Sequence, residues 1–265
     1  MKKIILQHVV LLFVSLMLLS SCMGEGRNVE SGGTFGVVRF DYEKAGKNVL
    51  DVTDDIALYH IFLETAYEGN CYWVVYEIDY DKPENSYESL IANGYLTVDI
   101  LEKAQIERWT VVPTLTDTSS AITNEVALLS PMLSYSTSSN PEWFYLKGIL
   151  CITSSLNIPT DQKMYWSLSF DRDNMITISE NTQYFDVFLR SSVRSQGSFS
   201  KGDVFISNAF DMRDYLKEAA NKVKEAGGTL FKLRINYPSL IDENGQLKWS
   251  SQATGDIPVS SFDTP

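Results

Sequence analysis

The sequence predicts a mainly β protein in which a small N-terminal barrel precedes a larger, strand-rich domain with one amphipathic helix. Three observations support this fold class. Short apolar or alternating segments recur along the chain between turn residues. A polar, hydroxyl-rich connector at residues 113–123 divides them, and helical periodicity is clear only at residues 211–226. We therefore expect domains at residues 34–112 and 124–265.

Five strand candidates within the first domain favour a small barrel. The clearest is residues 71–80, where Tyr72, Val74, Tyr76 and Ile78 alternate with a second set of side chains. We expect these four residues to face the inside of the barrel. The other candidates are residues 34–40, 56–63, 95–101 and 106–112.

The second domain contains most of the remaining strand-like segments. They are residues 142–153, 163–170, 175–179, 183–192, 203–207, 229–237 and 246–250. The helix at 211–226 has apolar residues at three- and four-residue spacing. Asp211 is a candidate N-cap, and the pair Gly227-Gly228 is expected to end the helix in a left-handed conformation.

Composition excludes several function classes. The chain has 265 residues, with 22 Lys and Arg against 34 Asp and Glu. Removing a leader that contains Lys2 and Lys3 leaves a net charge of 20 − 34 = −14. Such a surface repels phosphate, so we expect no nucleic-acid partner. Only His60 would remain of the two histidines, so we expect no multi-histidine metal site, and neither a metal nor another cofactor.

Residues 1–21 have the pattern of a lipoprotein signal peptide. Two lysines precede an apolar run that is shorter than a membrane span, and Ser20 and Ser21 then stand before Cys22. A cysteine after small residues resembles a bacterial lipobox, in which lipid is attached to the sulfur. We therefore expect Cys22 to be the lipid-attachment site and the membrane to be a partner through that lipid.

The residues that follow Cys22 are polar and rich in glycine, so residues 22–33 are expected to form a flexible tether. A lipid-anchored protein of this kind belongs to the cell envelope, and we expect the outer membrane. Glu25 is the one acidic residue close to Cys22, and the periplasmic and surface faces both remain open.

The order of lipobox, glycine tether, barrel-like segments and strand-rich second half resembles the NigD-like lipoproteins. The supporting segments are Gly36-Val37-Val38, residues 49–55, residues 72–81 and residues 95–100. The resemblance implies an N-terminal barrel of the oligonucleotide/oligosaccharide-binding (OB) type and a C-terminal β-sandwich. It implies no catalytic residues, and the fold does not fix a function.

Two sequence patterns match known sites only in part. Residues 197–202 have the glycine spacing of a phosphate loop and contain an S-x-x-K segment, but Asp203 stands where the phosphate-binding lysine is required. The segment Asp171-Arg172-Asp173-Asn174 opens like a calcium loop, but Met175 and Ile176 follow where a ligand and a glycine are required. We interpret the first as a strand connection and the second as a tight turn.

Other chemistry-bearing residues give weaker signals. The acidic cluster Asp79, Asp81, Glu84 and Glu88 is interpreted as a solvated loop, with weak calcium binding as the alternative. His60, alone on a strand, is expected to be structural. The aromatic segment at residues 140–145 is the best candidate for exposed rings, and packing is the other interpretation.

Cys71 and Cys151 lie in apolar strand-like segments. We interpret them as buried free thiols, with a disulfide bond as the alternative, since a cell envelope permits one.

These observations predict a lipid-anchored envelope protein without catalytic residues, acting as a binding or interaction module with a glycan or protein ligand. The alternative is an envelope hydrolase that acts on glycans through carboxylates that the sequence does not locate.

Overall fold

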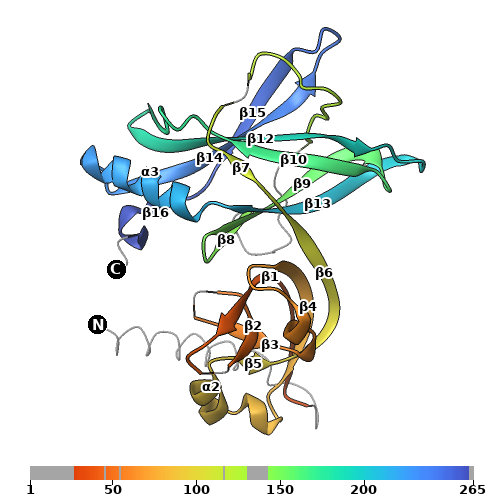
Figure 1. The fold of residues 1–265 in the computed structure, drawn as a ribbon, viewed down its shortest axis with the longest axis vertical. Helices are drawn as coiled ribbons and strands as arrows, with labels where there is room; N and C mark the ends of the chain where they lie inside the picture. Colours follow the sequence, from red (N-terminus) through yellow and green to blue (C-terminus); the bar gives the residue numbers. More distant parts are fainter. Residues whose placement is uncertain (1–26, 45, 54, 116, 130–142, 263–265) are drawn as a thin grey trace.

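The computed structural model describes most of the chain in two β domains (Figure 1). The described residues are 27–262, without residues 45, 54, 116 and 130–142. The predicted signal peptide and Cys22 lie outside them. Within the described residues, no helix combines the length and the apolar character that crossing a bilayer requires.

The N-terminal domain is built from six strands and three short helices. They are β1 (Val29–Asp41), β2 (Lys47–Asp51), β3 (Ala57–Tyr59), η1 (Ile61–Thr65), β4 (Cys71–Asp79), η2 (Pro83–Asn85), α2 (Tyr87–Asn93), β5 (Leu96–Thr97) and β6 (Asp99–Trp109). The paired order is β5-β3-β2-β1-β4-β6, in which only β3 and β5 are parallel. Although β5 and β6 are separated by Val98 alone, they are not paired with each other. The predicted OB-type fold is confirmed, but hydrogen bonds do not close its strands into the predicted barrel.

The core of this domain follows the predicted alternation of β4. Val74 is fully buried and Ile78 nearly so, while Tyr72 and Tyr76 are half-buried and pack against the same cluster. Burying a valine or an isoleucine contributes about 1.5–3 kcal/mol, so this face of β4 is a main source of the stability of the domain.

The first strand begins earlier than the sequence indicates. β1 starts at Val29, so the last five residues of the predicted tether form a strand that pairs with β4. Gly32 and Gly33 are packed against aromatic rings. A Cβ added at Gly32 would lie 2.8 Å from the Tyr76 hydroxyl, and a Cβ added at Gly33 would lie 3.0 Å from the Trp73 ring. Glycine composition favours a flexible linker, but here it permits close contact with two large rings.

The C-terminal domain contains two packed sheets and one long helix. Its elements are β7 (Val111–Val112), β8 (Trp143–Leu146), β9 (Ile149–Pro159), β10 (Lys163–Ser169), β11 (Ile176–Ser179), β12 (Thr182–Ser195), β13 (Lys201–Asp211), α3 (Arg213–Glu225), β14 (Leu230–Ile241), β15 (Leu247–Ala253), β16 (Ile257–Pro258) and η3 (Val259–Phe262). One sheet has the order β15-β14-β12-β10-β7, with β11 and β16 beside it. The other is the run β13-β9-β8, and the largest hydrophobic core lies between the two. The predicted sandwich-like architecture is confirmed.

Two local features differ from their predictions. The predicted strand at 142–153 is a hairpin of β8 and β9, which turns at Lys147 and Gly148 with φ angles of 51° and 88°. The N-cap of α3 is Met212, and Asp211 instead ends β13 and accepts a hydrogen bond from the Arg213 N–H at 3.3 Å. Helix α3 itself is confirmed, and Gly227 supplies the predicted left-handed conformation.

Strand β6 links the domains because it belongs to both. Its first part pairs with β4, and Glu107–Trp109 pairs in parallel with β13, which makes one nine-stranded sheet.

A separate apolar cluster contains residues of both domains, and we call it the junction cluster. Its buried members are Val37, Cys71, Ile106, Leu146, Ile149, Cys151 and Ala209.

The connector after β7 is held by one buried side chain from β12. Arg190 donates through Nη1 to the Asp117 carbonyl at 2.6 Å and through Nη2 to the Ser120 carbonyl at 2.9 Å. It also forms a salt bridge with Glu125, and the two side chains are 1% and 0% exposed. A polar, turn-like segment is thereby fixed against the sandwich.

Candidate functional site

The β1–β2 turn of the OB domain is positioned by Asp41. Its Oδ1 accepts hydrogen bonds from the backbone N–H groups of Glu43 and Lys44, each at 3.2 Å. Gly46, with φ of 59°, donates its N–H to the Asp41 carbonyl at 2.7 Å. A short aspartate side chain and a glycine in the left-handed region are the residues that such a turn favours.

Arg39 on β1 connects this turn to the neighbouring strand. Its guanidinium donates to both carboxylate oxygens of Asp51, through Nε at 2.8 Å and Nη2 at 3.1 Å, and its Nη1 lies 3.6 Å from Asp41 Oδ1. The hydrogen bond with Asp51 is the main reason that the pKa of Arg39 is raised. The bidentate pair with Asp51 holds the Arg39 guanidinium in place. The Arg39 side chain is 39% exposed, whereas the carboxylates of Asp41 and Asp51 beside it are nearly buried.

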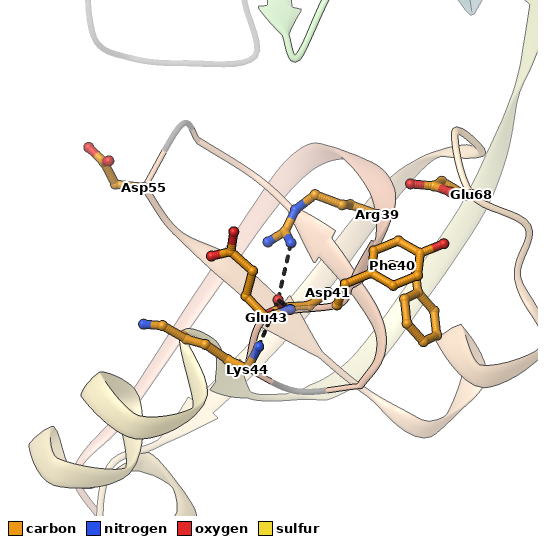
Figure 2. A pocket seen from close by; sticks show the side chains of 9 residues that line it. Arg39, Phe40, Asp41, Glu43, Lys44, Asp55 and Glu68 are labelled. Carbon is orange, nitrogen blue, oxygen red and sulfur yellow. Dashed lines mark hydrogen bonds and ion pairs between the residues drawn. The ribbon is translucent and has the colours of Figure 1, made fainter.

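Beside this ion pair the surface is hollowed into an open cavity of about 580 Å³ (Figure 2). The residues that line it are Arg39, Phe40, Asp41, Tyr42, Glu43, Lys44, Asp55, Glu68 and Gly94. Figure 2 shows Asp41 joined by dashed lines to Arg39 and Lys44. Lys44 also donates through Nζ to the Ile91 carbonyl at 3.2 Å, which ties the turn to α2.

An exposed aromatic ring stands in this lining. Tyr42 is 79% exposed, and its ring is tilted against that of Phe40 with the centroids 4.4 Å apart. Tyr67, which is 80% exposed, directly precedes the lining residue Glu68. Rings of this kind offer a flat apolar face to a ligand together with a polar hydroxyl group.

The charge of the lining limits what can bind. Two cations, Arg39 and Lys44, face four carboxylates, and Arg39 is already paired with Asp51. A phosphate-rich ligand would meet an excess of negative charge, whereas a neutral ligand with many hydroxyl groups would find acceptors and an aromatic face.

Two residues of the acidic cluster, Asp79 and Asp81, and also His60 have structural partners elsewhere in the OB domain. The Asp79 carboxylate is nearly buried and accepts from Arg27 Nη2 at 2.8 Å, while Asp81 accepts from the Asn28 N–H at 3.0 Å. His60 caps η1, because its Nδ1 accepts from the Phe62 N–H at 3.2 Å. These residues hold together the start of β1, the end of β4 and the turn after β3.

The two loop patterns of the second domain are also structural. Asp171 accepts hydrogen bonds from the N–H groups of Asp173 and Asn174 and forms the predicted tight turn before β11. The segment after β12 is held by Asp161, whose carboxylate accepts from the N–H groups of Ser198 and Phe199 at 2.9 and 3.1 Å. These two hydrogen bonds lower the pKa of Asp161 to about 2.

The predicted aromatic segment lies mostly outside the described residues. Within it, Tyr145 is half-buried and packs against the large core. Cys71 and Cys151 are buried thiols, and both belong to the junction cluster. The fold therefore brings together two cysteines that are far apart in the sequence.

Sequence reasoning did not identify the cavity or its main residues, Arg39, Asp41, Tyr42 and Lys44. A local signal was present, because an aspartate, an aromatic residue and a glycine stand within the turn between two apolar runs. The contributions of Asp55, Glu68 and Gly94 arise only when three loops meet in the fold.

Residues 26–104 match a family model described as a lipoprotein OB domain. The first part of the chain is therefore similar to a lipoprotein OB domain, as the predicted resemblance implies. No curated protein sequence matches the chain.

The chain is similar to solved structures that the comparison covers over nearly their whole length. An uncharacterized protein from Parabacteroides merdae covers 86% of this chain and 99% of its own, with 16% identity and a TM-score of 0.68. A "Putative lipoprotein" from Bacteroides fragilis covers 85% and 97%, with 10% identity and a TM-score of 0.57. A NigD-like immunity protein from Bacteroides caccae covers 86% and 94%, with 12% identity and a TM-score of 0.44.

Proposed function

We propose that this protein is an outer-membrane lipoprotein, anchored through Cys22, whose OB domain binds a glycan in the cavity beside the β1–β2 turn. The observation that carries the proposal is the exposed Tyr42 ring next to a rigid set of charged groups. OB folds bind oligonucleotides or oligosaccharides on this type of surface, and the loop after their first strand contributes to it.

The lining favours a sugar over a nucleic acid. The lining has four carboxylates and two cations, so its net charge is negative, like that of the whole chain. A sugar ring can pack its apolar face on Tyr42 while its hydroxyl groups donate to the carboxylates. Because Asp41 and Arg39 are held by the turn and by Asp51, these polar groups are pre-organised before the ligand arrives.

Binding without catalysis is the better-supported activity. The acid catalyst of a glycosidase needs a raised carboxyl pKa. In the cavity, Asp41 accepts two backbone hydrogen bonds that serve the turn.

The binding proposal is tested with the purified chain on an array of bacterial and host glycans, followed by titration calorimetry with the best ligand. Tyr42→Ala should weaken binding about tenfold or more, whereas Tyr42→Phe should retain most of it because the ring remains. Tyr87→Ala is the matched control, since Tyr87 is a 65% exposed tyrosine of the same domain outside the cavity. Equal affinity of Tyr42→Ala and the wild type would place the ligand elsewhere.

The anchoring proposal has a separate test. Cys22→Ser should abolish the incorporation of labelled palmitate and release the protein from the membrane fraction. A Cys22→Ser protein that still takes up palmitate would rule out lipid attachment at this residue. Density-gradient separation of the two membranes then tests the outer-membrane location of the wild type.

A further inference from the structure

Cys71 and Cys151 come together at the junction because of the register of four strands. Cys71 on β4 lies opposite Ile106 on β6, and Cys151 on β9 lies opposite Ala209 on β13. The same part of β6 pairs with β13, since Arg108 lies opposite Ala209. All four apolar side chains belong to the junction cluster, so the sheet bends at β6 and β13 and brings its two sides face to face.

The two thiol groups lie in the same buried cluster and interact with each other, because each is the main cause of the shifted pKa of the other. Cys71 also donates to the Gly69 carbonyl at 3.6 Å. Both residues are buried, with 0% and 2% exposure, and Phe35 and Trp73 pack against their cluster. A covalent bond between the sulfurs would therefore replace an existing contact inside an apolar environment, without burying a new polar group.

We propose that Cys71 and Cys151 form a disulfide bond that joins the OB domain to the sandwich in the exported protein. The oxidant is a small or protein disulfide of the cell envelope. One cysteine loses its proton, and its thiolate attacks one sulfur of this disulfide and releases the other sulfur as a thiolate, which takes up a proton. The second cysteine then loses its proton and displaces the remaining thiolate, which is protonated in turn, so that the cysteine pair gives up two electrons and two protons and the oxidant becomes two thiols.

The surroundings couple the ionisation of the two cysteines. The pKa of Cys71 is lowered, first because of the hydrogen bond with the Cys151 thiol, and burial opposes this effect. Arg108, which donates to the Gly69 carbonyl and to Asp211, also lowers the pKa of Cys71, while the negative charge of Asp211 raises it. The pKa of Cys151 is raised by the same thiol contact and by burial. Each thiol is therefore sensitive to the protonation of the other.

The bond would join residues on different domains and would constrain the unfolded chain over a long loop. This inference uses the envelope location of the proposed function, because disulfides persist in oxidising compartments. One arm of the test below does not depend on that location.

The first arm uses the full chain, exported by a bacterial host. The membrane fraction is unfolded in guanidinium chloride with N-ethylmaleimide and without a reductant, then digested with trypsin for mass spectrometry. We expect the Cys71 peptide joined to the Cys151 peptide, with a mass two hydrogens below the sum of the free peptides. Recovery of both peptides separately, each carrying maleimide, would overturn the proposal.

The second arm uses purified, reduced chain in buffers of oxidised and reduced glutathione. The bond should form as the oxidised fraction rises, and reduction should lower the urea midpoint of the wild type but not that of Cys71→Ala/Cys151→Ala. If glutathione forms only mixed disulfides on single cysteines, the proposal fails. If cell fractionation places the protein in the cytoplasm, the proposed function is wrong. The glutathione experiment still tests the disulfide bond in that case, because it uses purified protein. The wild-type mapping decides the question even if the double variant does not fold.

Discussion

Replacing Arg190 by methionine should strongly destabilise the C-terminal domain. The guanidinium is 1% exposed, and it donates to both oxygens of Glu125, at 2.6 Å for the Nε–Oε1 pair, and to the carbonyls of Asp117 and Ser120. Methionine fills a similar volume but has no donor. The Glu125 carboxylate, which is 0% exposed, would then be a buried charge without its counter-ion.

The size of the effect follows from this geometry. Removing one partner of a buried ion pair costs about 3–5 kcal/mol, chiefly because the other charge stays buried and uncompensated. Replacing both partners removes that penalty, so Arg190→Met/Glu125→Met should be at least about 1 kcal/mol more stable than Arg190→Met alone. The Ile122 N–H, which donates to Glu125 Oε2 at 2.8 Å, would lose its partner in the double variant and limit the recovery.

Urea unfolding followed by tryptophan fluorescence measures these free energies. The control is Arg194→Met, on the same strand, because Arg194 is 50% exposed and its salt bridge to Glu107 should contribute less than about 1 kcal/mol. A loss below about 1 kcal/mol for Arg190→Met would refute the reasoning. A double variant as unstable as the sum of its single variants would refute it too.

Three further outcomes are expected. Val74→Asp places a charge at a fully buried position and should unfold the OB domain, which loss of its resistance to proteolysis would reveal, while Val74→Ile should remain folded. Gly36→Ala should cost about 1–3 kcal/mol by urea unfolding, because the new Cβ would lie 2.4 Å from Leu50 Cγ and force that side chain to move; an unchanged midpoint would contradict this. Asp161 has a pKa lowered from 3.8 to about 2, so it stabilises the folded state above about pH 4 and loses this effect as the pH falls toward 2. The difference in urea midpoint between wild type and Asp161→Asn should therefore be largest at neutral pH, and a difference independent of pH would count against the argument.

Local periodicity was sufficient to predict the elements that have one regularly spaced apolar face. Alternation identified β4 and its buried residues Val74 and Ile78, and three- and four-residue spacing identified α3. These patterns predict the face that meets the core of the same domain, but they gave no sign that Cys71, on the opposite face of β4, is also buried.

Strand β9 shows why the junction could not be predicted. Leu150 and Ile152 point into the large core, whereas Ile149 and Cys151 belong to the junction cluster, so the strand is buried on both faces. A continuous apolar run is the sequence signature of such a strand, but it does not say which partner covers the second face. The partner here comes from β4, about 80 residues earlier in the chain.

The same limit applies to Arg190 and to the cavity. An arginine within a strand gives no sign that its guanidinium will bind a connector some 65–73 residues away, as it does at Asp117 and Glu125. The cavity likewise depends on the meeting of the β1–β2 turn with residues of other loops. Contacts of this kind leave no periodic pattern in the sequence, so they become visible only in the fold.

The sharing of β6 between two domains has a consequence for synthesis and export. A chain that emerges from its N-terminus completes the OB strands about 100 residues before β13 is available to pair with Glu107–Trp109. During that interval the outer edge of β6 is a template for pairing with other chains, which is the usual origin of aggregation at sheet edges. The exposed side chains of β6 include Glu102, Lys103, Glu107 and Arg108. Such alternating charges disfavour pairing with other chains before β13 has been synthesised.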